Sequence, residues 1–220
     1  MIEIEDWLQD PLRKIENGTY KTRKLKSPDE KRNDLWQIFH FSTRLKLNAA
    51  EHFCRQMFGA ASMSYDFGLP LLAFSQLKWY LDAFFFEIIS AYDTLLQELN
   101  VVYDMGLKPK QIRWANRNTK ESKFLSLLRA KSPKVFDYME KERKEEWFEN
   151  VRQYRNMAAH RHYVPTNALI MGYAEPQMDI FYLDDNGNMQ RAEISKCRTY
   201  LESMVGHIHQ VWENMAQEFE

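Results

Sequence analysis

The sequence has few residues that break regular structure. Only seven glycines and seven prolines occur among 220 residues. This scarcity predicts long uninterrupted elements and a mainly helical protein. There are also only two cysteines, Cys54 and Cys197, and both lie beside apolar residues. Two thiols of this kind exclude a disulfide framework and argue against a cysteine metal site, so we expect them to be buried and reduced.

Long apolar runs are absent as well. The most apolar stretch, residues 69–89, is interrupted by Lys78, Asp82 and Glu87, so it falls short of the roughly 18 residues of a membrane-spanning helix. The first ten residues, MIEIEDWLQD, are acidic and contain no apolar run, so we expect no signal peptide. These absences predict a cytoplasmic protein with no membrane partner.

No excess of charge dictates a partner, because the net charge is −1. This near-neutral total hides a basic segment, residues 108–134, that has nine cations and one acid. The cations are Lys108, Lys110, Arg113, Arg117, Lys120, Lys123, Arg129, Lys131 and Lys134. One interpretation is a solvated basic surface. The other is a surface that binds a phosphate backbone, with Lys108, Lys110, Arg113 and Arg117 as candidate RNA-binding residues.

The remaining chain predicts long helices. Ser27-Pro28-Asp29-Glu30 is a helix start, and this helix should end near Phe58, before Gly59, with residues 59–73 as a connection. Its apolar side should carry Ile38, Phe41, Leu45, Ala49 and Phe53. A second helix, about Phe74–Tyr103, repeats apolar residues in alternating steps of four and three: Leu77, Leu81, Phe84, Ile88, Ala91 and Leu95.

Further helices follow. Asn118 with Glu121 resembles a cap for a short helix through Leu128, and Ser132-Pro133 starts a helix that should continue into the one containing Trp147. Period-two patterning then predicts a small β-hairpin insertion at about 168–193, with a turn at residues 184–187. The last helix, about Ser195–Glu218, should bury Cys197, Leu201, Met204, Ile208, Val211 and Met215. We therefore expect an N-terminal extension, residues 1–27, and one helical domain, residues 28–220.

The helix around Trp147–His160 carries the candidate site. Trp147, Val151, Tyr154 and Ala158 recur at the spacing of one buried helix face. At about 100° per residue, Arg155, Asn156 and His160 lie outside this stripe. The pattern therefore predicts that an arginine, an asparagine and a histidine project away from the core of the helix. Pro165 should end the helix soon after His160.

Other kinds of site lack their motifs. There is no phosphate-binding glycine loop, no dinucleotide pattern, no serine-nucleophile elbow and no His-Glu-x-x-His. His160 and His162, like His207 and His209, are two residues apart. On a helix they point about 200° apart, so neither pair can hold one metal ion. We expect neither a metal nor a cofactor.

Arg155 followed by a polar residue, with a histidine five positions later near the end of a helix, resembles the R-x4-6-H motif of the HEPN superfamily. This resemblance implies an up-and-down helical bundle that forms a homodimer, with the two motif helices facing each other. It also implies metal-independent RNA cleavage, in a toxin or defence role, with a nucleotidyltransferase or an antitoxin as partner. Arg155, Asn156 and His160 would then be catalytic, with Arg152 and Arg161 contacting RNA.

Two other interpretations stay open. Many HEPN-like proteins are non-catalytic modules that bind nucleotide, RNA or protein. Basic and histidine side chains at a helix C-terminus also complement the helix dipole without any further function. A plain helical interaction protein with a solvated basic surface would show the same residues.

Overall fold

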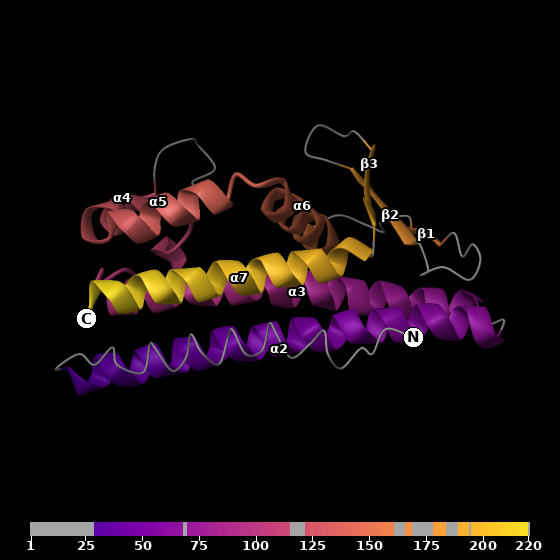
Figure 1. Cartoon of the computed structure of the whole chain (residues 1–220), viewed down its shortest axis with the longest axis horizontal. Coiled ribbons are helices and arrows are strands. Elements are labelled where there is room, and N and C mark those ends of the chain that lie inside the picture. The colour runs from indigo at the N-terminus through magenta and orange to yellow at the C-terminus, as the bar shows by residue number, and fades with distance from the viewer. Residues whose placement is uncertain are drawn as a thin grey trace. The chain divides into compact units, whose positions relative to one another are not determined.

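The computed structural model describes residues 29–67, 70–114, 122–160, 166–168, 178–183, 189–193 and 195–219. Its elements are α2 (Glu30–Phe67), α3 (Pro70–Val102), the 3-10 turn η1 (Pro109–Gln111), α4 (Lys123–Lys131), α5 (Pro133–Glu142), α6 (Glu146–His160), β1 (Thr166–Ala168), β2 (Met178–Leu183), β3 (Met189–Glu193) and α7 (Ser195–Glu218) (Figure 1). The protein is mainly helical, as the sequence predicts.

The chain divides into two compact units. The first comprises Met1–Leu45, Ser90–Glu145 and Met204–Glu220, and the second comprises Lys46–Ile89 and Glu146–Ser203. Helices α2, α3 and α7 contribute residues to both units. The predicted N-terminal extension lies outside the described residues.

The apolar stripes predicted for α3 and α7 are confirmed. All six stripe residues of α3 and all six of α7 are buried. Both stripes follow the alternating steps of three and four that hold one face of a helix against its neighbours. The predicted bounds of α7 are also those observed.

The prediction for α2 is wrong in its buried face. Ile38, Phe41 and Leu45 are at least half exposed, and the buried residues form a neighbouring line. That line is Trp36, His40, Thr43, Leu47, Ala50, Cys54 and Met57. This line keeps the alternating spacing of three and four. Because it includes the polar residues His40 and Thr43, apolar periodicity alone does not identify it. Helix α2 also continues through Gly59 to Phe67, because one helical glycine costs only about 1 kcal/mol. Most of the predicted connection is therefore helix.

A buried carboxylate joins three helices in the first unit. Glu98 on α3 is fully buried and accepts hydrogen bonds from the indole N–H groups of Trp36 on α2 and Trp212 on α7, at 3.1 and 3.0 Å. His40 Nδ1 lies 2.8 Å from Glu98 Oε1. The His40 ring lies 5.3 Å from the Trp36 ring and 4.3 Å from that of Trp212. Both carboxylate oxygens thus have partners, which a buried charge requires.

Helices α4 and α5 pack against each other in the first unit (Figure 1). Ser122, rather than the predicted Asn118, caps α4, since its Oγ accepts a hydrogen bond from Leu125 N–H. Ser132 caps α5 in the same way and donates to Glu218 on α7 at 2.6 Å. Asn118 itself lies outside the described residues.

The continuous helix predicted from Ser132-Pro133 into the Trp147 region is also wrong, because Arg143–Glu145 separate α5 from α6. Helix α5 buries Val135, Phe136 and Met139, whereas α6 buries Phe148, Val151 and Tyr154. On one straight helix these two apolar faces would point about 110° apart. A break allows each helix to bury its own face within its own unit.

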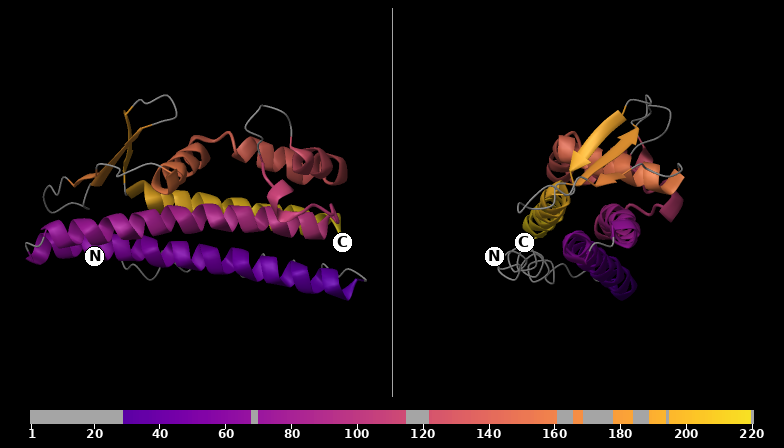
Figure 2. Two further views of the ribbon diagram at one scale, coloured as in Figure 1. Left: turned by 180° about the vertical axis from the view of Figure 1, so that it is seen from behind. Right: turned by 90° about the vertical axis from the view of Figure 1, so that its right-hand side faces the viewer.

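The second unit includes α6 and a small antiparallel sheet of order β1-β2-β3. Thr166 pairs with Ile180, and Leu183 pairs with Met189. The predicted turn at residues 184–187 lies outside the described residues. Strand β2 contacts α6, and Figure 2 shows the sheet beside this helix. Cys54 and Cys197 are buried and free, as predicted. Among the described residues no helix is long and apolar enough to span a membrane.

Candidate functional site: the α6 motif and a basic pocket

The predicted motif lies on one unbroken helix. Helix α6 extends to His160, so Arg155, Asn156 and His160 occupy successive turns and span about 7.5 Å along the axis. Asn156 and His160 are four residues apart, a spacing that places both on one side of a helix. Their side chains, together with Arg117 and Arg161, lie outside what the structure describes.

Arg155 is oriented differently from the prediction. The buried face of α6 is centred on Phe148, Val151 and Tyr154, while Trp147 is half-buried. At about 100° per residue, Arg155 falls between Val151 and Phe148. Its side chain is half-buried and its Nε is buried. The buried stripe begins at Phe148 rather than at the predicted Trp147. The Arg155 side chain therefore lies at the edge of the core and does not face away from it.

Two polar contacts hold α6 in the second unit. Tyr154 is buried, and its hydroxyl donates to Asp82 Oδ1 on α3 at 3.3 Å, while Lys78 Nζ lies 2.9 Å from Asp82 Oδ2. Burial raises the pKa of Tyr154 well above its usual value, and the negative charge of Asp82 adds to this. Asn150 Nδ2 donates to the Tyr200 hydroxyl on α7 at 3.4 Å. These bonds fix the rotation of the helix directly before Arg155.

Arg152, a predicted RNA contact, has an acidic partner on its own helix. Its Nε and Nη2 donate to the two carboxylate oxygens of Glu149 at 2.9 and 2.6 Å. The same carboxylate accepts a hydrogen bond from Gln153 at 2.7 Å. An anionic ligand at Arg152 would have to compete with this two-point ion pair.

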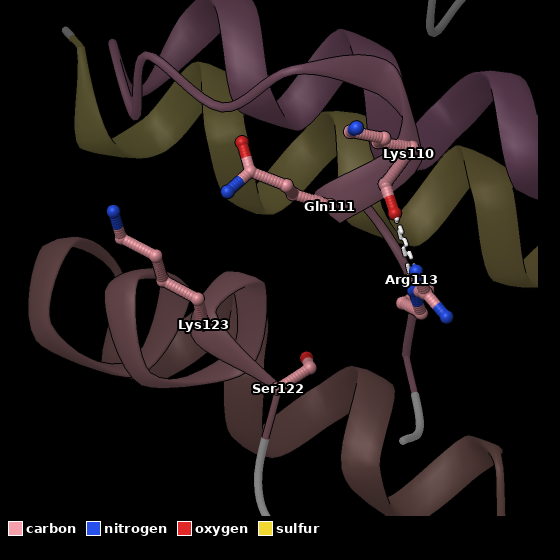
Figure 3. Close-up of a pocket in the computed structure, with 5 residues that line it drawn as sticks. All are labelled: Lys110, Gln111, Arg113, Ser122 and Lys123. Atoms are coloured by element: carbon pink, nitrogen blue, oxygen red, sulfur yellow. Dashed lines mark hydrogen bonds between the residues drawn. The ribbon is translucent and has the colours of Figure 1, made fainter. Parts of the chain in front are cut away.

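A basic pocket lies in the first unit, apart in the chain from the motif. The cavity measures about 410 Å³ and is lined by Lys110, Gln111, Arg113, Ser122 and Lys123. Figure 3 shows the segment that carries Lys110, Gln111 and Arg113 opposite Ser122 and Lys123, at the start of α4. Arg113 is held in place because its Nε and Nη2 donate to the Lys110 carbonyl at 3.1 and 2.8 Å. Three cations and no acid line the described part of this cavity.

The structure thus brings together only part of the predicted RNA-binding set. Lys110 and Arg113 share the pocket, while Lys108 is exposed on the same segment outside the lining. The prediction missed Ser122 and Lys123 as site residues. The Ser-x-x-Leu cap at Ser122 was the available signal, because it places Lys123 in the first turn of α4. No group of three or more potential metal ligands occurs among the described residues.

A mainly helical fold and an Arg-Asn-x3-His motif on one helix are the features of the HEPN class. Residues 72–220 match the family model described as Cthe2314-like HEPN. This match covers more than half of the chain and contains α6, the basic pocket and α7. The chain therefore belongs to the Cthe2314-like HEPN family. No curated protein and no solved structure matched the chain.

Proposed function

We propose that this HEPN protein is a metal-independent endoribonuclease whose reaction depends on Arg155, Asn156 and His160. The observation that supports the proposal most directly is the continuity of α6 through His160. It keeps an anion-binding side chain and a group that can transfer protons within two turns of one helix. Family membership agrees with this assignment.

The reaction needs one nucleophile, one leaving group and proton transfer. The ribose 2′-oxygen attacks the adjacent phosphorus, and the bond from phosphorus to the 5′-oxygen of the next nucleotide breaks. One strand is left with a 2′,3′-cyclic phosphate and the other with a 5′-hydroxyl. The 2′-hydroxyl loses a proton and the 5′-oxygen gains one, so the reaction consumes no water and no cofactor.

Each side chain has a chemical role in this scheme. An imidazole can exchange protons near neutral pH, so His160 acts on the 2′-hydroxyl or the 5′-oxygen. The planar guanidinium of Arg155 stabilises the extra negative charge on phosphorus. Its partial burial strengthens this interaction, because water screens charges less at the edge of a core. Asn156, four residues before His160, orients the imidazole or binds the ribose.

We propose a homodimer in which the two motif helices form one composite groove around a twofold axis. A nuclease of this kind needs control in the cell, so we propose a toxin or defence role with an antitoxin or nucleotidyltransferase partner. The RNA strand would be held by the basic segment, including Lys108, Lys110 and Arg113, which are exposed.

Cleavage of single-stranded RNA in EDTA tests the proposal. His160→Ala should lower the cleavage rate at least about a hundredfold, since general acid–base catalysis contributes about 10² to 10⁴. Arg155→Ala should have an effect of similar size. His52→Ala is the matched control, because His52 is an exposed histidine outside the motif. Equal cleavage by wild type and both motif variants would refute the site assignment.

The basic pocket favours one alternative, a non-catalytic HEPN module that binds RNA. In that case RNA would bind without being cleaved, and its salt-dependent affinity would survive Arg155→Ala. The affinity would fall when Lys108, Arg113 and Arg117 are replaced together. Cleavage that disappears with His160→Ala would decide against this alternative.

A further inference from the structure

We propose that the basic pocket of the first unit binds a phosphate monoester: the terminal phosphate of an RNA strand or a small organic phosphate. The site is separate in sequence from the α6 motif, and the proposal does not depend on whether that motif cleaves RNA. Lys110, Arg113 and Lys123 provide its positive charge.

The size of the cavity suits such a ligand. About 410 Å³ lies within the ~300–1,000 Å³ range of small-molecule pockets. A cavity of this volume admits a phosphate together with the group that it esterifies. An exposed basic surface that binds only internal phosphodiesters would need no concave site.

The charges favour a dianion. An internal phosphodiester carries one negative charge, whereas a phosphate monoester carries about −1.5 to −2 at pH 7, since its second pKa is about 6. The described lining presents three cations and no carboxylate. Electrostatic attraction therefore increases more for a monoester than for an internal phosphate of the same strand.

The donor geometry is partly organised before any ligand arrives. The two hydrogen bonds from Arg113 to the Lys110 carbonyl fix the guanidinium on η1. Gln111 is held as well, because its Oε1 accepts from Lys108 N–H at 3.0 Å. On the opposite side Ser122 is buried and held as the cap of α4. Groups that are already ordered lose less conformational entropy when a ligand binds.

The test compares two RNA oligonucleotides of one sequence, one with a 5′-phosphate and one with a 5′-hydroxyl. Binding is measured by fluorescence anisotropy with the full-length His160→Ala protein in EDTA, so that cleavage cannot disturb the measurement. The phosphorylated strand should bind about tenfold more tightly at about pH 7.5, and this preference should shrink at about pH 5, where the monoester keeps its second proton.

Variants localise the effect. Lys123→Gln and Arg113→Gln should each remove most of the preference for the 5′-phosphate. Arg113→Lys keeps the charge but loses the two-point bond to Lys110, so it should keep only part of the preference. Lys141→Gln is the control, because Lys141 is an exposed lysine of the same unit outside the lining. Circular dichroism melting curves would show that these surface variants are folded.

The source of the phosphate is settled by competition. Displacement of the phosphorylated strand by inorganic phosphate or by a mononucleotide would indicate a small organic phosphate as ligand. Displacement only by a second phosphorylated strand would indicate an RNA end. Equal affinity for the two oligonucleotides, or an unchanged preference in Lys123→Gln and Arg113→Gln, would overturn the proposal. Loss of RNA cleavage in a separate assay would not, because binding is measured without it.

Discussion

Glu98 in the first unit and Asp82 in the second lie on the same helix, α3, and each accepts a hydrogen bond from an aromatic side chain on another helix. Their surroundings differ. The Glu98 side chain is 0% exposed and bonded through both oxygens to ring N–H groups, whereas the Asp82 side chain is 35% exposed and shares its charge with Lys78. Glu98 thus joins three helices within a core, whereas Asp82 holds α6 through one hydrogen bond at a partly exposed position.

This difference indicates where each unit tolerates change. When one member of a buried polar cluster is removed, the remaining groups have neither a protein partner nor water to hydrogen-bond with. A partly exposed group can replace a lost partner with water. The first unit should therefore be sensitive to single polar substitutions. The second unit, which carries the α6 motif, should accept small changes in the position of its helix.

The largest effect is expected for Glu98→Ala. It leaves the indole N–H groups of Trp36 and Trp212 without their acceptor, so the free energy of unfolding should fall by about 3–5 kcal/mol. Urea denaturation followed by circular dichroism measures this loss. Glu202→Ala is the control, because Glu202 is exposed and lies 3.8 Å from Arg198; its loss should stay within about 0.5 kcal/mol. Similar losses for the two variants would contradict the comparison.

A smaller effect concerns pH. His207 is buried between Tyr92 and Tyr138, and burial lowers its pKa from 6.5 to about 3. The unfolded state therefore binds a proton below about pH 6.5 that the folded state does not bind until about pH 3. The contribution of His207 to the free energy of unfolding is therefore fully present above about pH 6.5. Below that pH it falls by about 1.4 kcal/mol per pH unit.

The measurement is urea unfolding from about pH 7 to about pH 4.5. In His207→Phe the contribution of this one histidine to the slope should vanish. Identical slopes in wild type and His207→Phe would show that His207 does not stay neutral in the folded protein.

The smallest effect is expected for Tyr154→Phe in the second unit. It removes the hydroxyl bonded to Asp82 but keeps the ring, which lies 4.1 Å from that of Phe85. The loss should be about 0.5–1.5 kcal/mol, because Asp82 retains Lys78 and access to water. Tyr80→Phe serves as the control, because Tyr80 is a half-buried tyrosine of the same unit, on α3. If Tyr154→Phe lowered the free energy of unfolding as much as Glu98→Ala, the two units would not differ in their sensitivity to polar substitutions.

The helices that the sequence predicted best are those whose buried lines are apolar along most of their length, although the line of α3 reaches the buried acid Glu98 three residues after Leu95. In α3 and α7 every buried stripe position is apolar or a cysteine, so spacing alone identifies the face. In α2 the buried line includes His40 and Thr43, and His40 is accommodated by Glu98, which lies 58 residues away. No pattern within α2 reveals a partner on another helix, so the sequence favours the more apolar neighbouring line.

The candidate site shows the same limit. The position of the motif on one helix followed from local periodicity, but the inward rotation of Arg155 depended on whether Trp147 or Phe148 is buried, which packing against other elements decides. Likewise, the charges of residues 108–134 were visible in the sequence. That Lys123 lines the same cavity as Lys110 and Arg113 was not visible, because it depends on α4 starting at its cap, Ser122, beside the segment that carries the other two.

Ser132 has a consequence for anyone who shortens or tags this chain. Its hydroxyl caps α5 by accepting a hydrogen bond from Val135 N–H, and it donates a hydrogen bond to Glu218. The other carboxylate oxygen of Glu218 accepts a hydrogen bond from the Tyr103 hydroxyl at 2.6 Å. Cutting the chain before Glu218 would therefore loosen a helix start 86 residues upstream. An affinity tag should therefore be added after Glu218, and it should not replace this residue.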